Sequence, residues 1–198
     1  MTAPRFTQLA ARAVVMLDAD VDTDQIIPAR YLKGTDKAGL ADALIADWRA
    51  RPDCPIGAPH SAGAQILVAG NNFGCGSSRE HAAWALEDFG FRVVIAPSFG
   101  DIFHTNAIKT GLAPIVVTPS QLAELQAAVD ARNELTVDLE SLTITHPDGL
   151  RIEFPFDPHA QETLVHGLDD VARTMLRDAE ISGFEATHPA RFDTRTLV

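Results

Sequence analysis

Apolar residues follow two periodicities along the first 132 residues of the chain. Continuous apolar runs predict buried strands at residues 13–17, 66–69, 93–96 and 115–117. Apolar residues at helical spacing predict intervening helices at residues 40–48, 79–88, 98–110 and 119–132. Gly90 and Gly111 follow two of these helices and are typical of helix ends. Strands that alternate with helices in this way indicate an α/β fold.

The pattern changes after residue 132. Short segments at residues 135–139, 142–145 and 150–154 predict strands, and Pro147, Asp148 and Gly149 predict a hairpin turn between the last two. Residues 159–183 have helical spacing, and a polar tail follows. Because no internal repeat or linker is visible, we expect one domain over residues 1–198, with a helical C-terminal extension from about residue 159.

Composition narrows the classes of function. The 198 residues are 46% hydrophobic, and their net charge of −11 argues against nucleic-acid binding. No apolar run approaches the roughly 20 residues that span a bilayer, and no secretory signal is visible. We therefore expect a cytoplasmic protein that binds no membrane. Cys54 and Cys75 are too few to hold an iron–sulfur cluster or a structural zinc ion, so we expect no metal in this chain.

The segment 71–81 carries the most distinctive chemistry. It places two glycines, Ser77, Ser78 and Arg79 between a predicted strand and a predicted helix. Free N–H groups at a helix start, two hydroxyls and a guanidinium favour an anion. Ser77 and Glu80 equally fit a capping box, which would serve the helix alone. The Rossmann, phosphate-loop and hydrolase-elbow motifs each lack a required residue here.

A second polar segment, residues 20–25, alternates carboxylates with other residues. It lacks the glycine and the terminal glutamate of an EF-hand loop, so calcium binding is not predicted. From local sequence alone, the pattern favours a turn rich in aspartate side chains.

Together these motifs resemble the small-subunit family of 3-isopropylmalate dehydratases in the aconitase superfamily. The resemblance spans nearly the whole chain and rests on residues 21–29, 72–86, 98–103, Asn106 and 167–170. It implies an α/β swivelling domain of the aconitase type, with three layers (β/β/α) and C-terminal helices. It also implies a hydro-lyase that is active only with a large subunit, which would carry the 4Fe–4S cluster that this chain lacks.

The resemblance implies roles for individual residues in the conversion of 2-isopropylmalate to 3-isopropylmalate during leucine biosynthesis. Ser77 would be the catalytic base, and Asp24 would support it in the same cleft. The cluster iron would activate the departing hydroxyl as a Lewis acid. The implied contacts to a small di- or tricarboxylate substrate are Ser78, Arg79, Tyr31, Leu32 and Lys33.

Residues 31–39 depart from the usual pattern of that family. Lys37 and Ala38 stand where members commonly have arginine and threonine. Tyr31 and Leu32 suit an isopropyl group, whereas Lys33 or Lys37 would suit a third carboxylate. Two alternatives therefore stay open, namely a related hydratase for methylmalate or homoaconitate, and a non-catalytic anion-binding module.

Overall fold

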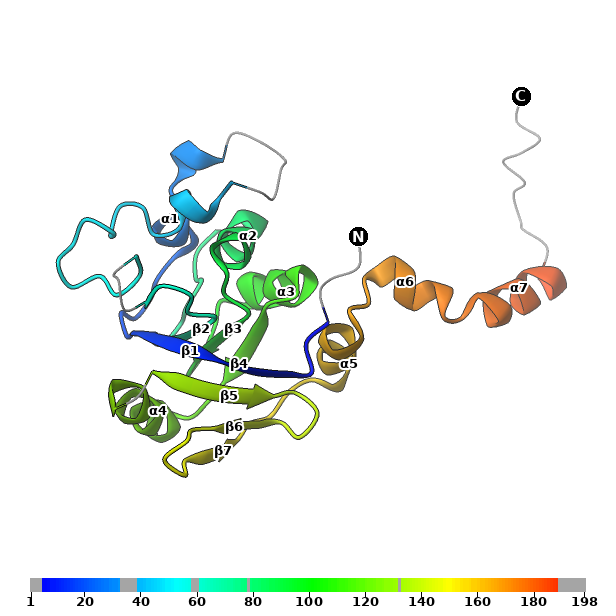
Figure 1. The fold of residues 1–198 in the computed structure, drawn as a ribbon. Helices are drawn as coiled ribbons and strands as arrows, with labels where there is room; N and C mark the ends of the chain where they lie inside the picture. The colour runs from blue at the N-terminus through cyan, green and yellow to red at the C-terminus, as the bar shows by residue number, and fades with distance from the viewer. Residues whose placement is uncertain (1–4, 33–38, 58–60, 78, 132, 189–198) are drawn as a thin grey trace.

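The computed structural model describes residues 5–32, 39–57, 61–77, 79–131 and 133–188. In chain order, its helices and strands (Figure 1) are β1 (Gln8–Met16), α1 (Thr23–Ile26), the 3-10 helices η1 (Ala29–Tyr31) and η2 (Ala41–Ala43), β2 (Ile66–Ala69), α2 (Glu80–Phe89), β3 (Val93–Ala96), α3 (Asp101–Thr110), β4 (Ala113–Val116), α4 (Pro119–Ala131), β5 (Glu134–Asp138), β6 (Thr143–Thr145), β7 (Arg151–Glu153), α5 (Pro158–His166), α6 (Asp170–Met175) and α7 (Asp178–Thr187).

The seven strands form one curled sheet in the order β4-β3-β2-β1-β5-β6-β7. Strands β1 to β4 are parallel, whereas β5, β6 and β7 run antiparallel to their neighbours. Strand β1 joins the parallel half of the sheet (β2 to β4) to the antiparallel half (β5 to β7), because different parts of β1 pair with each half. Its residues Gln8 to Arg12 pair with β5, and its residues Ala13 to Met16 pair with β2. The two halves can therefore fold over each other around β1.

Burial along β2 defines the layers. All four residues of β2 are buried, as expected for a strand that is covered on both faces. Leu67 and Ala69 belong to a core shared with α2 and α3, whereas Ile66 and Val68 belong to a core shared with β5, β6 and β7. Figure 1 shows α2 and α3 on one side of the parallel strands and β5 to β7 on the other. The predicted three-layer β/β/α fold is confirmed.

Most predicted elements are present, with two instructive differences. Strand β1 begins at Gln8, earlier than predicted. Its first five residues alternate in exposure and include the polar Gln8 and Arg12, so they do not give the signal of a fully buried strand. The helix predicted at residues 40–48 is wrong, since only the 3-10 turn η2 forms there. Ile45 has a left-handed φ of 51°, and its N–H donates to the carbonyl of Ile26 at 2.7 Å. This long-range bond takes the chain out of a helical path.

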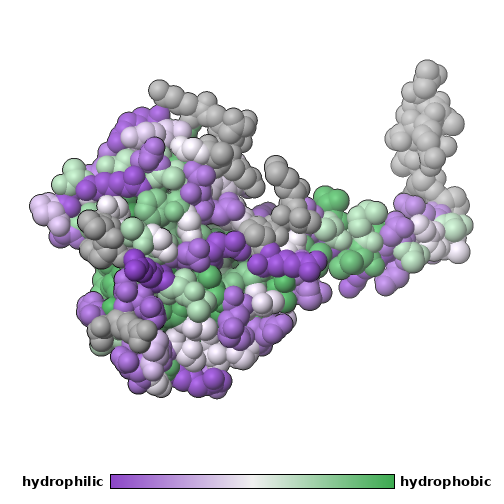
Figure 2. All heavy atoms as spheres, viewed as in Figure 1, coloured by the Kyte–Doolittle hydropathy of each residue, from purple (hydrophilic) through white to green (hydrophobic). Residues whose placement is uncertain are grey.

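The C-terminal helices leave the body of the molecule. Helix α5 packs through the buried Ala160 and Leu164, but α6 and α7 extend away from it (Figure 1). Arg173 fixes the start of this arm, because its guanidinium donates to Glu162 at 2.8 Å and to the carbonyl of His159 at 3.2 Å. Apolar side chains remain exposed on α6 and after it, where Figure 2 shows a hydrophobic patch. Among the described residues, no helix has the length and apolar character needed to cross a membrane.

Candidate functional site

The carboxyl ends of β1, β2 and β3 lie at one edge of the parallel sheet, where α/β proteins generally bind ligands. The loop after β1 and the loop after β2 are joined there by backbone hydrogen bonds. The N–H of Gly74 donates to the carbonyl of Val21 at 2.7 Å, and the N–H of Thr23 donates to that of Cys75 at 3.0 Å. These two bonds join the loops into one structural unit.

The loop after β3 is tied to the same unit. The N–H of Phe73 donates to the carbonyl of Ser98 at 3.1 Å, and the N–H of Gly100 donates to that of Phe73 at 3.0 Å. These bonds hold residues 98–100 extended against the β2 loop, which is why α3 begins at Asp101 and not at the predicted Ser98.

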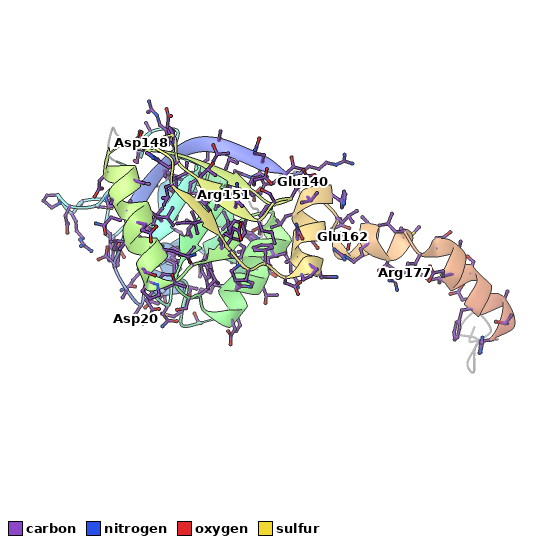
Figure 3. The ribbon with its side chains drawn as sticks, turned by 90° about the horizontal axis from the view of Figure 1, so that it is seen from below. Asp20, Glu140, Asp148, Arg151, Glu162 and Arg177 are labelled. Atoms are coloured by element: carbon purple, nitrogen blue, oxygen red, sulfur yellow. The ribbon has the colours of Figure 1, made fainter. Side chains whose placement is uncertain are left out.

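Side chains reinforce these junctions. Asn72 has a left-handed φ of 56°, and its amide donates to Asp20 at 2.7 Å while its N–H donates to the hydroxyl of Ser98 at 2.9 Å. The Ser98 hydroxyl donates in turn to Asn71 at 2.9 Å. Figure 3 shows Asp20 at the end of the body away from Glu140, which lies in the β5–β6 turn. Sequence reasoning missed these supports, although each polar residue closely follows a parallel strand.

Gly74 lets the β2 loop approach α3 closely. Its φ is +73°, and a Cβ at this position would lie 2.3 Å from Cγ of Phe103, which is 1% exposed. Only glycine can combine this backbone conformation with such a contact. The loop that carries Ser77 is thereby seated directly on the aromatic core.

Helix α1 projects from the β1 loop and is fixed by a capping box. The carboxylate of Asp22 accepts from the N–H of Gln25 at 2.7 Å, and the side chain of Gln25 accepts from the N–H of Asp22 at 2.8 Å. Residues 20–25 therefore form more than the predicted turn. The D-x-x-Q spacing is the signal that identifies this cap in the sequence. It sets Thr23 and Asp24 in the first turn of the helix.

The capping interpretation of Ser77 and Glu80 is wrong. Helix α2 begins at Glu80, and its N-cap is Arg79, which has an extended backbone and no side-chain cap bond. Ser77 is exposed, and its side chain turns toward α1. Its carbonyl accepts from the hydroxyl of Thr23 at 3.0 Å, and its own Oγ lies 3.3 Å from Oγ1 of Thr23.

Arg79 and Asp24 form an ion pair that joins the start of α2 to α1. The Arg79 side chain is 25% exposed and the Asp24 side chain 53%, so the guanidinium is the more enclosed partner. The structure thus brings together three residues of the predicted site, namely Ser77, Asp24 and Arg79. Two others, Ser78 and Lys33, lie outside the described residues, as does Lys37.

Tyr31 and Leu32 follow α1 along the chain. Tyr31 ends η1 and is 39% exposed, with the Arg30 guanidinium 4.8 Å above its ring. Leu32 is partly buried against the core that α2 and α3 cover. Tyr31 therefore presents an exposed ring close in sequence to the site, whereas Leu32 contributes mainly to packing.

The two thiols of the chain do not suit an iron–sulfur cluster. Cys54 donates to the carbonyl of Ile56 at 3.5 Å, and Cys75 donates to that of Asp20 at 3.4 Å. Burial, together with the carboxylates of Asp20 and Asp22, raises the pKa of Cys75 and disfavours the thiolate that binds metal. Within the described ranges, no three His, Cys, Asp or Glu side chains gather as a metal site.

Comparison with known proteins gives a consistent result over nearly the full length. The family model of the aconitase C-terminal domain matches residues 3–120, and the model LeuD_N matches residues 123–158. A protein of Chloroflexus aurantiacus named 3-isopropylmalate dehydratase small subunit is 46% identical, over 94% of this chain and 97% of its own length. A protein of the same name from Anaeromyxobacter dehalogenans is 49% identical, over 89% and 95%.

A solved structure agrees with these relatives. The crystal structure of 3-isopropylmalate dehydratase (leuD) from Methanocaldococcus jannaschii matches with a TM-score of 0.66 and 33% identity, and covers 89% of this chain and 98% of that one. The three-layer fold and the loops at the carboxyl edge of its sheet thus accompany a similarity in sequence that extends over most of the chain. The chain belongs to the family of 3-isopropylmalate dehydratase small subunits, in the aconitase superfamily.

Proposed function

We propose that this chain is the small subunit of a 3-isopropylmalate dehydratase, which interconverts 2-isopropylmalate and 3-isopropylmalate by dehydration and rehydration in leucine biosynthesis. The observation that carries the proposal is the meeting of Ser77, Thr23, Asp24 and Arg79 at the carboxyl edge of the sheet. The names of the relatives favour isopropylmalate over methylmalate and homoaconitate as the substrate.

In this proposal Ser77 moves the proton. Its ionised Oγ takes the proton from the carbon next to a substrate carboxylate, and the electron pair of that C–H bond forms the double bond as hydroxide leaves the neighbouring carbon. Rehydration reverses these movements with the hydroxyl on the other carbon. A serine hydroxyl has a pKa far above 7, so the alkoxide needs donors that are already aimed at it. The exposure of Ser77 leaves one side of its Oγ open to substrate.

Arg79 binds a substrate carboxylate. A guanidinium matches a carboxylate through two parallel hydrogen bonds, and Asp24 already occupies one side of it. Asp24 therefore holds the Arg79 fork in a fixed orientation, which reduces the entropy lost when substrate binds. Ser78 would assist at the same anion, and Tyr31, Leu32 and Lys33 would contact the substrate side group.

The remaining chemistry belongs to a large subunit. We infer that the partner holds a 4Fe–4S cluster, which would act as a Lewis acid on the departing hydroxyl. Residues 1–198 would act as one swivelling domain that brings the carboxyl edge of its sheet to that partner. We place the complex in the cytoplasm, as its role in amino-acid synthesis suggests.

The decisive experiment uses Ser77→Ala in the complex reconstituted anaerobically with the candidate large subunit. Absorbance of the unsaturated intermediate reports turnover of 2-isopropylmalate, with methylmalate and homocitrate as competing substrates. We expect the variant to lose turnover and to keep its stability within about 0.5 kcal/mol, because Ser77 is exposed and caps no helix.

Ser141→Ala is the matched control. Ser141 is also an exposed serine, but it lies in the turn after β5. The last residue of β5, Asp138, pairs with Gln8 at the start of β1, so this turn is at the opposite end of β1 from the site. It should keep full turnover. Substantial turnover by Ser77→Ala would exclude Ser77 as the base, and a preference for another acid would reassign the substrate.

A further inference from the structure

We propose that Thr23 is a positioning residue for Ser77, and that its single hydroxyl hydrogen shifts from the carbonyl of Ser77 to Oγ of Ser77 when that oxygen ionises. The inference rests on the proposed function, because it assumes that Ser77 acts as a base. It adds a residue to which the family resemblance gave no role.

The geometry offers Thr23 two acceptors on one residue. Its Oγ1 lies 3.0 Å from the carbonyl oxygen of Ser77 and 3.3 Å from Oγ of the same residue. A threonine hydroxyl has one hydrogen to donate and two lone pairs to accept. While Ser77 is neutral, Thr23 donates to the carbonyl and accepts from the Ser77 hydroxyl. Once Ser77 has lost its proton to water, the same hydrogen can point to Oγ, by rotation about the Cβ–Oγ1 bond alone.

Thr23 is held rigidly in the position that this shift requires. Its N–H donates to the carbonyl of Cys75 at 3.0 Å, and its own carbonyl accepts from the N–H of Ile27 at 3.0 Å. The capping box of Asp22 and Gln25 fixes the helix turn around it. The donor is thus oriented before the reaction, which is the condition under which a hydrogen bond lowers a barrier most effectively.

Because Thr23 is buried, a hydrogen bond from its hydroxyl to Ser77 is stronger than one from a solvent water would be. Thr23 is 2% exposed, whereas Ser77 is exposed. Water therefore cannot replace the buried Thr23 hydroxyl as the donor on that side of Ser77. After Ser77 takes the proton from the substrate carbon, its hydroxyl again donates to Thr23 and the first arrangement returns.

The charged groups near Ser77 do not stabilise its ionised Oγ in place of the Thr23 hydroxyl. Arg79 is the cation of the site, but its ion pair with Asp24 offsets much of its charge. The titratable groups on the segments around Ser77, which a pH study must consider together, are Asp20, Asp22, Asp24, Cys75, Arg79, Glu80, His81 and Asp101. Most of them are acidic and oppose an alkoxide, so a neutral donor is the more important support.

Thr23→Val and Thr23→Ser test the proposal in the reconstituted complex. Valine keeps the shape of threonine but has no hydroxyl, so we expect kcat to fall roughly 100-fold, the lower end of the effect of removing one oxyanion donor. KM should stay within about twofold, since substrate contacts are unchanged. The rising limb of the kcat–pH profile should move to higher pH. Thr23→Ser keeps the hydroxyl and should restore both kcat and the profile.

Three results would overturn the proposal: unchanged kcat in Thr23→Val, a loss that Thr23→Ser does not restore, or a loss with an unmoved pH profile. Ser77→Ala separates this inference from the proposed function. If Ser77→Ala stays active, the base assignment fails, whereas an inactive Ser77→Ala beside a fully active Thr23→Val refutes the role of Thr23 alone. If Thr23→Val does not fold, Thr23→Ala with the same measurements decides the question.

Discussion

Replacing Gly74 by alanine should destabilise the chain strongly, because two separate penalties meet at this residue. A left-handed conformation costs a residue with a Cβ about 1 to 2 kcal/mol, and Gly74 has a φ of +73°. The new Cβ would also lie 2.3 Å from Cγ of Phe103. That ring packs edge-on against Phe73 with centroids 5.4 Å apart, so it cannot move without disturbing the core. Overpacking of this kind costs about 1 to 3 kcal/mol.

The total loss is therefore about 2 to 5 kcal/mol, and each kcal/mol lowers the Tm by about 2 to 4 °C for a domain of this size. Urea and thermal unfolding followed by circular dichroism measure it. Gly63→Ala is the matched control, because Gly63 also has a φ of +73° but has no atom within 4 Å of the added Cβ. It should lose only about 1 to 2 kcal/mol.

Phe103→Ala tests the clash itself. In the double variant Gly74→Ala/Phe103→Ala the ring is gone and the new methyl has room. The loss of unfolding free energy in the double variant should therefore fall short of the sum of the two single losses by about 1 to 3 kcal/mol. If Gly74→Ala loses no more stability than Gly63→Ala, or if the two changes are additive, the contact with Phe103 does not define this loop.

Two further predictions concern charge. Arg79→Lys keeps the positive charge but loses the planar guanidinium, so kcat/KM should fall about 10- to 100-fold. Arg151→Lys, at an exposed position of β7, should leave kcat/KM unchanged. Equal activity of both variants would contradict carboxylate binding by Arg79. Burial lowers the pKa of His104, so the unfolded chain binds more protons than the folded one just below its usual value of about 6.5. Stability should therefore fall as the pH drops through about 6.5, and His104→Asn should flatten this dependence in urea unfolding. An unaltered slope in His104→Asn would refute the reasoning.

The central strands of the fold could be predicted from the sequence because their burial is local and complete. Strands β2 and β3 occupy the predicted residues, since a strand covered on both faces leaves a continuous apolar run. Gly90 and Gly111 end α2 and α3 in left-handed conformations, as their positions predicted. These signals need no knowledge of distant contacts.

The errors arose where a distant residue decided the local structure. The apolar residues of segment 40–48 have helical spacing, yet the bond from Ile45 to the carbonyl of Ile26 prevents a helix. Ser77 matches a capping box with Glu80, yet its side chain lies by Thr23, 54 positions earlier in the chain. Both segments satisfied a local rule that a tertiary contact overrode. The family resemblance placed Ser77, Asp24 and Arg79 in one cleft, but it could not supply the contact between Ser77 and Thr23.

That contact depends on the way in which β1 divides its pairing. Its last four residues pair with β2 in parallel, so the loops after both strands leave the same edge of the sheet. Its first five residues pair with β5 and fix the strand from the other side, so β1 cannot slip relative to β2 without breaking both sets of bonds. A register shift of one residue would move α1 by about 3.3 Å relative to the β2 loop, which is as long as the separation of the Thr23 and Ser77 hydroxyls. The alignment of the site is therefore a property of the sheet.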